Sequence, residues 1–167
     1  MYPGPRRRDP TEAQGDKPVA KPAVSLRVRA LQLLKRRDYS CAELERRLAP
    51  YTADASELST LLDELQALGW LSQQRLAEAL VRKGASRYGT RRILEQLQER
   101  GIGREVTDRL RSELQASELM RAQVVWTKRF GSLPTDLRER ARQERFLEQR
   151  GFDPEVIHGV LRGAGEE

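Results

Sequence analysis

Basic side chains gather between Leu80 and Ile93, and no acidic side chain interrupts them. The candidate binding residues of this stretch are Arg82, Lys83, Arg87, Tyr88, Arg91 and Arg92. A guanidinium can donate paired hydrogen bonds to a phosphate or a carboxylate, and a tyrosine ring offers a flat face. We therefore predict a loop between two helices that binds phosphates or an acidic protein surface. The competing interpretation is a solvated basic edge whose tyrosine packs on its neighbours.

The distribution of charge favours the binding interpretation. The chain has 167 residues and a formal net charge of +6. Residues 72–114 carry ten basic and six acidic side chains, a balance of +4, whereas residues 1–24 carry five and three, a balance of +2. An anionic partner, or a partner with an acidic patch, would thus meet the middle of the chain first.

Residue types that carry catalysis or hold metals are sparse. Cys41 and His158 are the single cysteine and histidine, and they lie far apart in the chain, whereas a zinc site needs about four closely spaced ligands. The sequence has no Gly-Lys-Ser/Thr phosphate loop, no dinucleotide-binding glycine pattern and no His-Glu-x-x-His helix. We expect a protein that is not an enzyme and that uses no cofactor and no metal.

The compartment is suggested by what the sequence does not contain. A single cysteine cannot form an internal disulfide, and the basic first residues are not followed by the apolar core of a signal peptide. No apolar run approaches the roughly 20 residues that cross a bilayer. We expect a cytoplasmic protein with no membrane segment.

Helices are expected to position these residues. Leucine, arginine, glutamate, glutamine and alanine, all good helix formers, dominate the chain. The pairs Ser40–Glu43 and Asp54–Glu57 have the spacing of capping boxes. Residues 1–24 hold five prolines and few apolar side chains, which predicts a disordered tail. The rest is predicted to be all-α, an elongated, curved array of about nine helices in three tandem three-helix repeats at residues 25–71, 72–116 and 117–167.

An internal repeat supports this arrangement. The segment Arg100-Gly101-Ile102-x-x-Glu105-Val106 matches Arg150-Gly151-Phe152-x-x-Glu155-Val156, fifty residues further on. In both, a helix is predicted to end at glycine, and one apolar residue fills the turn before the next helix. By analogy Trp70, after Gly69, is predicted to be a buried plug between the first two repeats, and Trp126 is also assigned to the core.

Two further groups of basic residues are given structural roles. The first group is Arg27, Arg29, Lys35, Arg36 and Arg37, which acidic residues balance, so we interpret it as a solvated face. Arg142, Arg145 and Arg150 alternate with glutamates, so we expect them to form ion pairs within their helix.

The order and spacing of several strings over some 140 residues resemble the RecX family. These strings are Ala30-Leu31-x-x-Leu34, Arg37-x-Tyr39-Ser40-x-x-Glu43-Leu44-x-x-Arg47-Leu48, Leu62-x-x-Leu65-x-x-Leu68-Gly69-Trp70-Leu71, Arg75-Leu76-Ala77, Val81-Arg82, Arg87-Tyr88-Gly89-x-Arg91-Arg92-Ile93 and Arg142-Gln143-x-Arg145-Phe146-Leu147-x-x-Arg150-Gly151-Phe152. The resemblance implies a regulatory protein that binds the RecA filament on DNA, lies in its helical groove, and inhibits its strand exchange, ATPase and coprotease activities.

Two other functions compete with this one. A direct DNA-binding protein, independent of RecA, would use the helix at Thr90–Arg100 in helix-turn-helix fashion, but its Arg91, Arg92, Gln96 and Gln98 are spread around the helix axis. A passive helical-repeat scaffold would affect no recombinase. We expect a monomer, because each repeat can pack on its neighbour.

Overall fold

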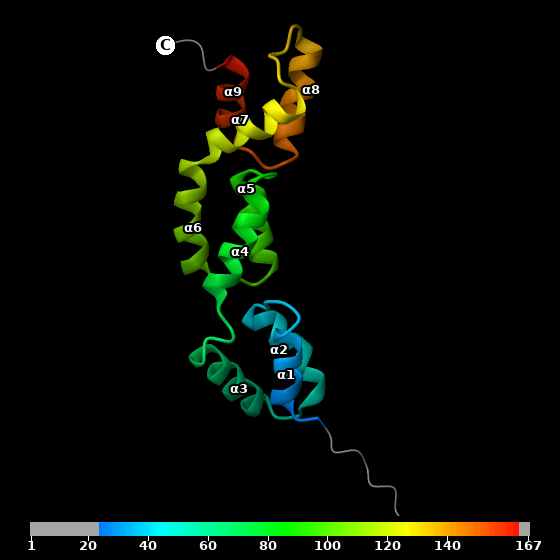
Figure 1. The fold of residues 1–167 in the computed structure, drawn as a ribbon, viewed down its shortest axis with the longest axis vertical. Coiled ribbons are helices and arrows are strands. Elements are labelled where there is room, and N and C mark those ends of the chain that lie inside the picture. Colours follow the sequence, from blue (N-terminus) through cyan, green and yellow to red (C-terminus); the bar gives the residue numbers. More distant parts are fainter. Residues whose placement is uncertain (1–23, 164–167) are drawn as a thin grey trace, which may run out of the picture.

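The structure is a computed structural model that describes residues 24–163. The helices stack along one long axis, from α1 at one end to α8 and α9 at the other (Figure 1). Within residues 24–163 there are nine α-helices, a short 3-10 helix at Ala49–Tyr51 and no strand. The helices are α1 (Leu26–Leu34), α2 (Cys41–Leu48), α3 (Ala55–Ala67), α4 (Gln73–Ala85), α5 (Thr90–Glu99), α6 (Arg104–Ala116), α7 (Glu118–Arg129), α8 (Leu137–Glu148) and α9 (Pro154–Arg162).

The prediction of an all-α chain built from helical repeats is confirmed. The predicted tail, residues 1–24, lies outside the described residues apart from Val24. None of the helices described here is long and apolar enough to cross a membrane.

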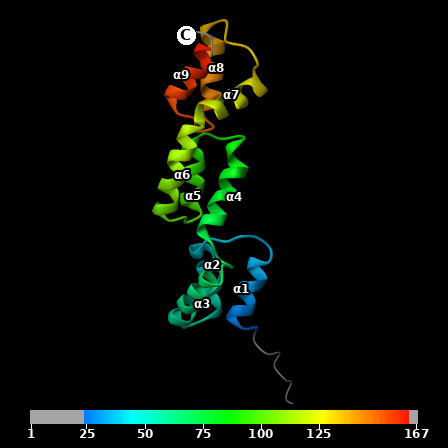
Figure 2. The same cartoon turned by 60° about the vertical axis from the view of Figure 1, so that its left-hand side comes forward.

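The buried apolar side chains form three clusters, one for each successive group of three helices. We call α1–α3 the first unit, α4–α6 the second and α7–α9 the third; Figure 2 shows them one above another. The centres of the clusters include Leu44, Leu48 and Leu65 in the first unit, Ile93 and Leu97 in the second, and Leu147 and Phe152 in the third. Each unit therefore has a small hydrophobic core of its own.

Side-chain caps fix the starts of several helices. Ser40 forms a complete capping box: its Oγ accepts from the amide of Glu43 at 3.1 Å, and the Glu43 carboxylate accepts from the amide of Ser40 at 3.0 Å. Asp54 caps α3, and hydrogen bonds from the amides of Ser56 and Glu57 lower its pKa. The second predicted box is incomplete, because the Glu57 carboxylate accepts from the Thr52 hydroxyl instead of the Asp54 amide.

The predicted glycine turn occurs three times. Gly69, Gly101 and Gly151 have φ angles of 73°, 71° and 80°, the left-handed conformation that closes a helix without steric cost only in glycine. In each turn the next amide donates to a carbonyl five residues back, as Ile102 does to Leu97 at 3.0 Å. The repeated sequence therefore encodes a repeated helix ending.

The side chain after the glycine is buried in two of the three turns and exposed in the third. Ile102 and Phe152 are 6% and 0% exposed, but Trp70 is 54% exposed, and the next residue, Leu71, is buried at 3%. The prediction that Trp70 is a buried plug is therefore wrong. The other two turns pack on a preceding unit, whereas within the described residues the first unit has none before it.

The contact between the first and second units illustrates this packing. The turn at Gly101 lies against the start of α2, where a Cβ on Gly101 would come within 3.1 Å of the Ala42 Cβ. Beside it the Arg100 guanidinium pairs with the Glu43 carboxylate at 2.8 Å. The second unit thus packs its glycine turn on the capped end of the first unit's middle helix.

Candidate interaction surface

The structure brings the six predicted residues to one end of the second unit, next to the third (Figure 1). Arg82 and Lys83 lie in the last turn of α4, Arg87 and Tyr88 in the loop that follows, and Arg91 and Arg92 in the first turn of α5. All five cations are exposed, while Tyr88 is half-buried against the second core.

The six residues have different surroundings. Arg91 donates to the backbone carbonyl of Glu148 at 3.0 Å, and Arg92 pairs loosely with Glu95 at 3.8 Å. Arg82, Lys83 and Arg87 form no ion pair with any residue from 24 to 163. Arg91 therefore helps to join two units, and the three unpaired cations remain open to a partner.

The junction between the second and third units, here the second joint, rests on a backbone contact. The amide of Gly89 donates to the carbonyl of Arg150 at 2.9 Å. A Cβ on Gly89 would overlap the carbonyl of Gly151 and the amide nitrogen of Phe152, and a Cβ on Gly151 would lie 2.7 Å from the Arg92 Cβ. Only glycine allows these two backbone segments to approach so closely.

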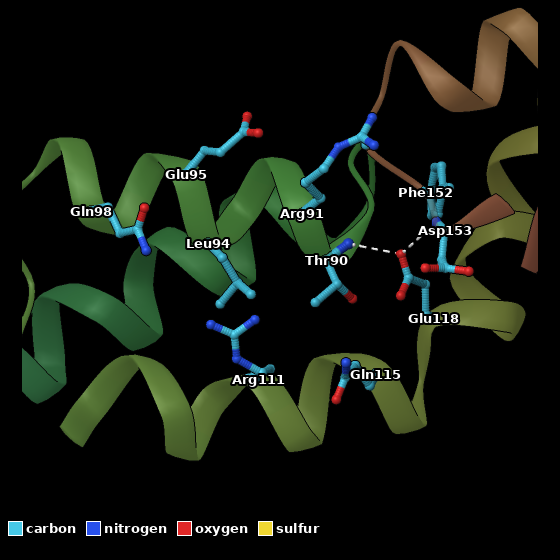
Figure 3. Close-up of a pocket in the computed structure, with 11 residues that line it drawn as sticks. Thr90, Arg91, Leu94, Glu95, Gln98, Arg111, Gln115, Glu118, Phe152 and Asp153 are labelled. Carbon is cyan, nitrogen blue, oxygen red and sulfur yellow. Dashed lines mark hydrogen bonds between the residues drawn. The ribbon is translucent and has the colours of Figure 1, made fainter. Parts of the chain in front are cut away.

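A buried carboxylate strengthens the second joint (Figure 3). Glu118, which is 4% exposed, accepts from the amide of Thr90 at 2.9 Å and from the amide of Asp153 at 3.3 Å. It lies at the edge of a pocket of about 320 Å³ between α5, α6 and the turn at Gly151. Acidic and basic side chains both line this pocket, so it does not favour ligands of either sign.

Arg121 holds the loop between α4 and α5 in place. Its guanidinium donates to the carbonyl of Tyr88 at 2.6 Å, to the Thr90 hydroxyl at 3.1 Å and to the carbonyl of Leu114 at 2.9 Å. Burial lowers the pKa of Arg121, and the Glu118 charge opposes that shift. The loop that carries Arg87 and Tyr88 is thus fixed to the third unit.

Part of this surface comes from three cations of the third unit that were not predicted to bind a partner. Lys128 and Arg129, in the last turn of α7, and Arg150, just after α8, line a groove of about 770 Å³ together with Arg87. The adjacent Lys-Arg pair at a predicted helix end was the only local signal. Its proximity to Arg87, some forty residues earlier, depends on the packing of two units.

The ion pairs expected for Arg142, Arg145 and Arg150 are absent among residues 24–163, so that prediction is wrong. Two glutamates of α8 have other partners: Glu144 pairs with Arg140, and Glu139 accepts from Thr135. Two of the three arginines lie over aromatic rings instead. Arg150 is 3.7 Å from the centroid of Phe146, and Arg142 is 5.8 Å from that of Phe130.

The other singled-out residues have ordinary surroundings. In the basic stretch of the first unit, Arg27 pairs with Glu64 at 2.6 Å across an exposed surface. The half-buried Trp126 donates to Gln143 at 2.6 Å, which confirms its assignment to the core.

The single cysteine and the single histidine lie apart from one another. Cys41 is half-buried, and burial, followed by the nearby Glu45 and Asp63 charges, raises the pKa of its thiol. His158 is exposed on α9, and residues 24–163 contain no cluster of three metal-ligating side chains.

Three helical units, each with its own core and joined by glycine turns, define a helical-repeat protein with a basic surface at one joint. A sequence profile for the third three-helix domain of RecX matches residues 116–161. Over 141 residues the chain is 45% identical to the regulatory protein RecX of Ralstonia nicotianae, which covers 84% of this chain and 89% of that protein. It is also 45% identical over 147 residues to the RecX of Leptothrix cholodnii, covering 88% and 94% of the two chains.

Solved structures agree on the fold. The crystal structure of RecX from Lactobacillus salivarius superposes with a TM-score of 0.71 at 17% identity, covering 82% of this chain and 92% of the other. The chain belongs to the RecX family of regulatory proteins, as the resemblance in its sequence indicates.

Proposed function

We propose that this protein binds the RecA filament on DNA and inhibits its recombinase, ATPase and coprotease activities. It acts as a cytoplasmic monomer without catalysis, and its repeats divide at residues 25–71, 72–116 and 117–167. The observation that carries the proposal is the set of unpaired cations at the second joint, Arg82, Lys83 and Arg87, in a chain whose relatives are RecX regulatory proteins. Two of these cations stand on the last turn of α4 and the third on the loop that Arg121 fixes, so their backbone is already ordered when an acidic or phosphate-bearing partner binds.

The shape of the chain suits a filament. Each unit contacts its neighbours along one axis, so the chain presents an extended surface (Figure 2). A filament repeats the same surface along its length, so an elongated protein can contact several subunits at once. Contacts at separate units then add to affinity through effective concentration.

The alternative, a direct DNA-binding protein that uses α5, has weaker support. A recognition helix contacts base edges with its N-terminal residues. In the first turn of α5 Thr90 is buried, the turn at Gly151 lies against Arg92, and Arg91 is directed to the Glu148 carbonyl. The exposed residues further along α5 include Glu95 and Glu99, which would repel phosphates.

ATP hydrolysis by the same organism's RecA on single-stranded DNA tests the proposal, with this protein titrated well below the RecA concentration. We expect inhibition at such ratios, and a large loss of inhibition when Arg82, Lys83 and Arg87 are changed to glutamate. Arg91 and Arg92 are left intact because they lie in the second joint. The matched control changes three exposed cations elsewhere, Arg104, Arg109 and Arg138, to glutamate, with the same change in net charge.

Three outcomes separate the candidates. Loss of inhibition in the first triple variant alone supports filament binding through this surface. Unchanged hydrolysis together with salt-sensitive binding of bare DNA supports the direct DNA-binding alternative. No effect on hydrolysis and no DNA binding would leave a passive scaffold and contradict the proposal.

A further inference from the structure

The groove at the second joint has a one-sided charge. Its rim carries four cations from three separate segments, Arg87, Lys128, Arg129 and Arg150, and no acidic side chain lines it. Its floor is apolar, formed by Val125, Tyr88 and Phe146. A cleft of about 770 Å³ lies within the usual range of ligand-binding sites. The groove is therefore suited to a ligand with several negative charges and an apolar side chain.

The aromatic floor is poorly suited to nucleic-acid bases. Single-stranded nucleic acids gain much of their affinity by stacking bases on open ring faces. The Arg150 guanidinium already lies 3.7 Å from the centroid of Phe146, and Phe130 meets the same ring edge-on at 5.1 Å. Tyr88 is half-buried against the second core. The groove therefore offers charge and apolar contact without a free stacking platform.

Arg150 is instead prepared to bind a carboxylate. Its side chain is held between the Phe146 ring and the Phe146 carbonyl, to which Nη1 donates at 3.2 Å. One edge of the guanidinium is therefore fixed and the other nitrogens remain available. A guanidinium held in this way loses little entropy when it binds a carboxylate through two hydrogen bonds.

We propose that this groove binds an acidic segment of a partner protein, with aspartate or glutamate carboxylates on the four cations and an apolar side chain on Val125 and Phe146. The inference rests on the proposed function, because it names the chemistry of the partner segment that the basic surface meets. Charge complementarity and the occupied ring faces favour a peptide over a nucleic acid.

Fluorescence anisotropy with the full chain tests the inference at about 0.15 M salt, where charges further than about 8 Å apart are largely screened. The probe is a labelled synthetic nonapeptide of aspartate and glutamate with a central leucine. A second peptide has asparagine and glutamine in place of the acids, and a thymidine oligonucleotide carries a similar charge. We expect the acidic peptide to bind, and the other two to bind at least fivefold more weakly.

Two variants separate a built site from general attraction. Arg150→Lys keeps the charge but removes the stacked fork. Lys128→Gln removes one exposed charge that forms no ion pair with any residue from 24 to 163. Each should weaken peptide binding at least fivefold, whereas the control Arg138→Gln, on the far end of α8, should change it less than twofold. Circular dichroism confirms that each variant remains helical.

Equal binding by wild type and both variants would overturn the inference. So would tighter binding of the oligonucleotide that both variants reduce, because the groove would then be a nucleic-acid site. RecA hydrolysis measured in parallel distinguishes the two proposals. Inhibition without peptide binding refutes only the groove, whereas peptide binding that depends on Arg150 without inhibition refutes only the filament function.

Discussion

Replacing Gly89 with alanine should uncouple the third unit from the second. Gly89 has a φ of −74°, which alanine adopts freely. The effect therefore arises only from the close approach of the backbone segments at Gly89 and Gly151. The new methyl group would overlap the backbone of Gly151 and Phe152, and backbone cannot move aside as a flexible side chain can. The two units must therefore separate.

The structure gives the magnitude of the loss. Five hydrogen bonds cross the second joint near Gly89. Three run from Gly89 to the Arg150 carbonyl at 2.9 Å, from Thr90 to Glu118 at 2.9 Å and from Arg91 to the Glu148 carbonyl at 3.0 Å. The other two run from Arg121 to the Tyr88 carbonyl at 2.6 Å and to the Thr90 hydroxyl at 3.1 Å. At about 1 kcal/mol for each bond, their loss lowers the free energy of unfolding by about 5 kcal/mol. Each unit retains its own core, so most of the helix content should survive.

The assay follows urea unfolding by circular dichroism and by Trp126 fluorescence, in a Trp70→Phe background so that only the third unit is reported. In the reference protein the two curves should coincide; in Gly89→Ala they should separate, with Trp126 reporting an earlier transition. The control is Gly69→Ala, where φ is +73° and a Cβ meets nothing within 4 Å. There the cost is only the left-handed backbone, roughly 1–2 kcal/mol, without uncoupling. Coincident curves with an unchanged midpoint in Gly89→Ala would refute the reasoning.

Three other perturbations have defined outcomes. Glu118→Ala leaves the buried amide of Thr90 and the partly buried amide of Asp153 without an acceptor, so urea denaturation should show a loss of about 2 kcal/mol. Glu118→Gln should show a smaller loss, and equal stability of all three proteins would contradict this. Gln143→Ala removes the acceptor of the Trp126 indole and should lower the free energy of unfolding by about 2 kcal/mol, measured by the same method. An unchanged free energy of unfolding would mean that this hydrogen bond does not stabilise the fold. The raised pKa of Cys41 means that the folded chain keeps its thiol proton at pH values above the ordinary thiol pKa of about 9.0. Alkylation by iodoacetamide near that pH should therefore be slower in the folded chain than in urea, and stability should fall as pH rises above it; equal rates would count against the shift.

The helices and their repetition were predictable because local rules decide them. Capping residues, glycine endings and leucine spacing act within a few residues, so Ser40 with Glu43, and Gly101 with Ile102, could be identified from the sequence alone. Trp70 was mispredicted because its turn has the same backbone as the other two but no preceding unit to pack on among the described residues. Burial at that position is decided by the neighbouring unit.

The candidate site was predicted only in part for the same reason. The stretch from Arg82 to Arg92 is local in sequence, so its charge could be seen directly. Lys128, Arg129 and Arg150 come from the third unit and reach the groove only through the second joint. The ion pair expected for Arg150 is absent, because its guanidinium lies over the Phe146 ring. The binding role expected for Arg91 was incomplete, because its guanidinium donates to the Glu148 carbonyl within the second joint.

The second joint therefore links stability to binding. The cations of the groove stand on two units, and their spacing is set by contacts of backbone with backbone at Gly89 and Gly151. In an array where each unit contacts only its neighbours, no distant part of the described chain can restore that spacing once the joint opens. Gly89 does not line the groove. A change at Gly89 should nevertheless lower the affinity for a partner that bridges Arg87 and Arg150, while the affinity for a partner that contacts only Arg82 and Lys83 should stay the same.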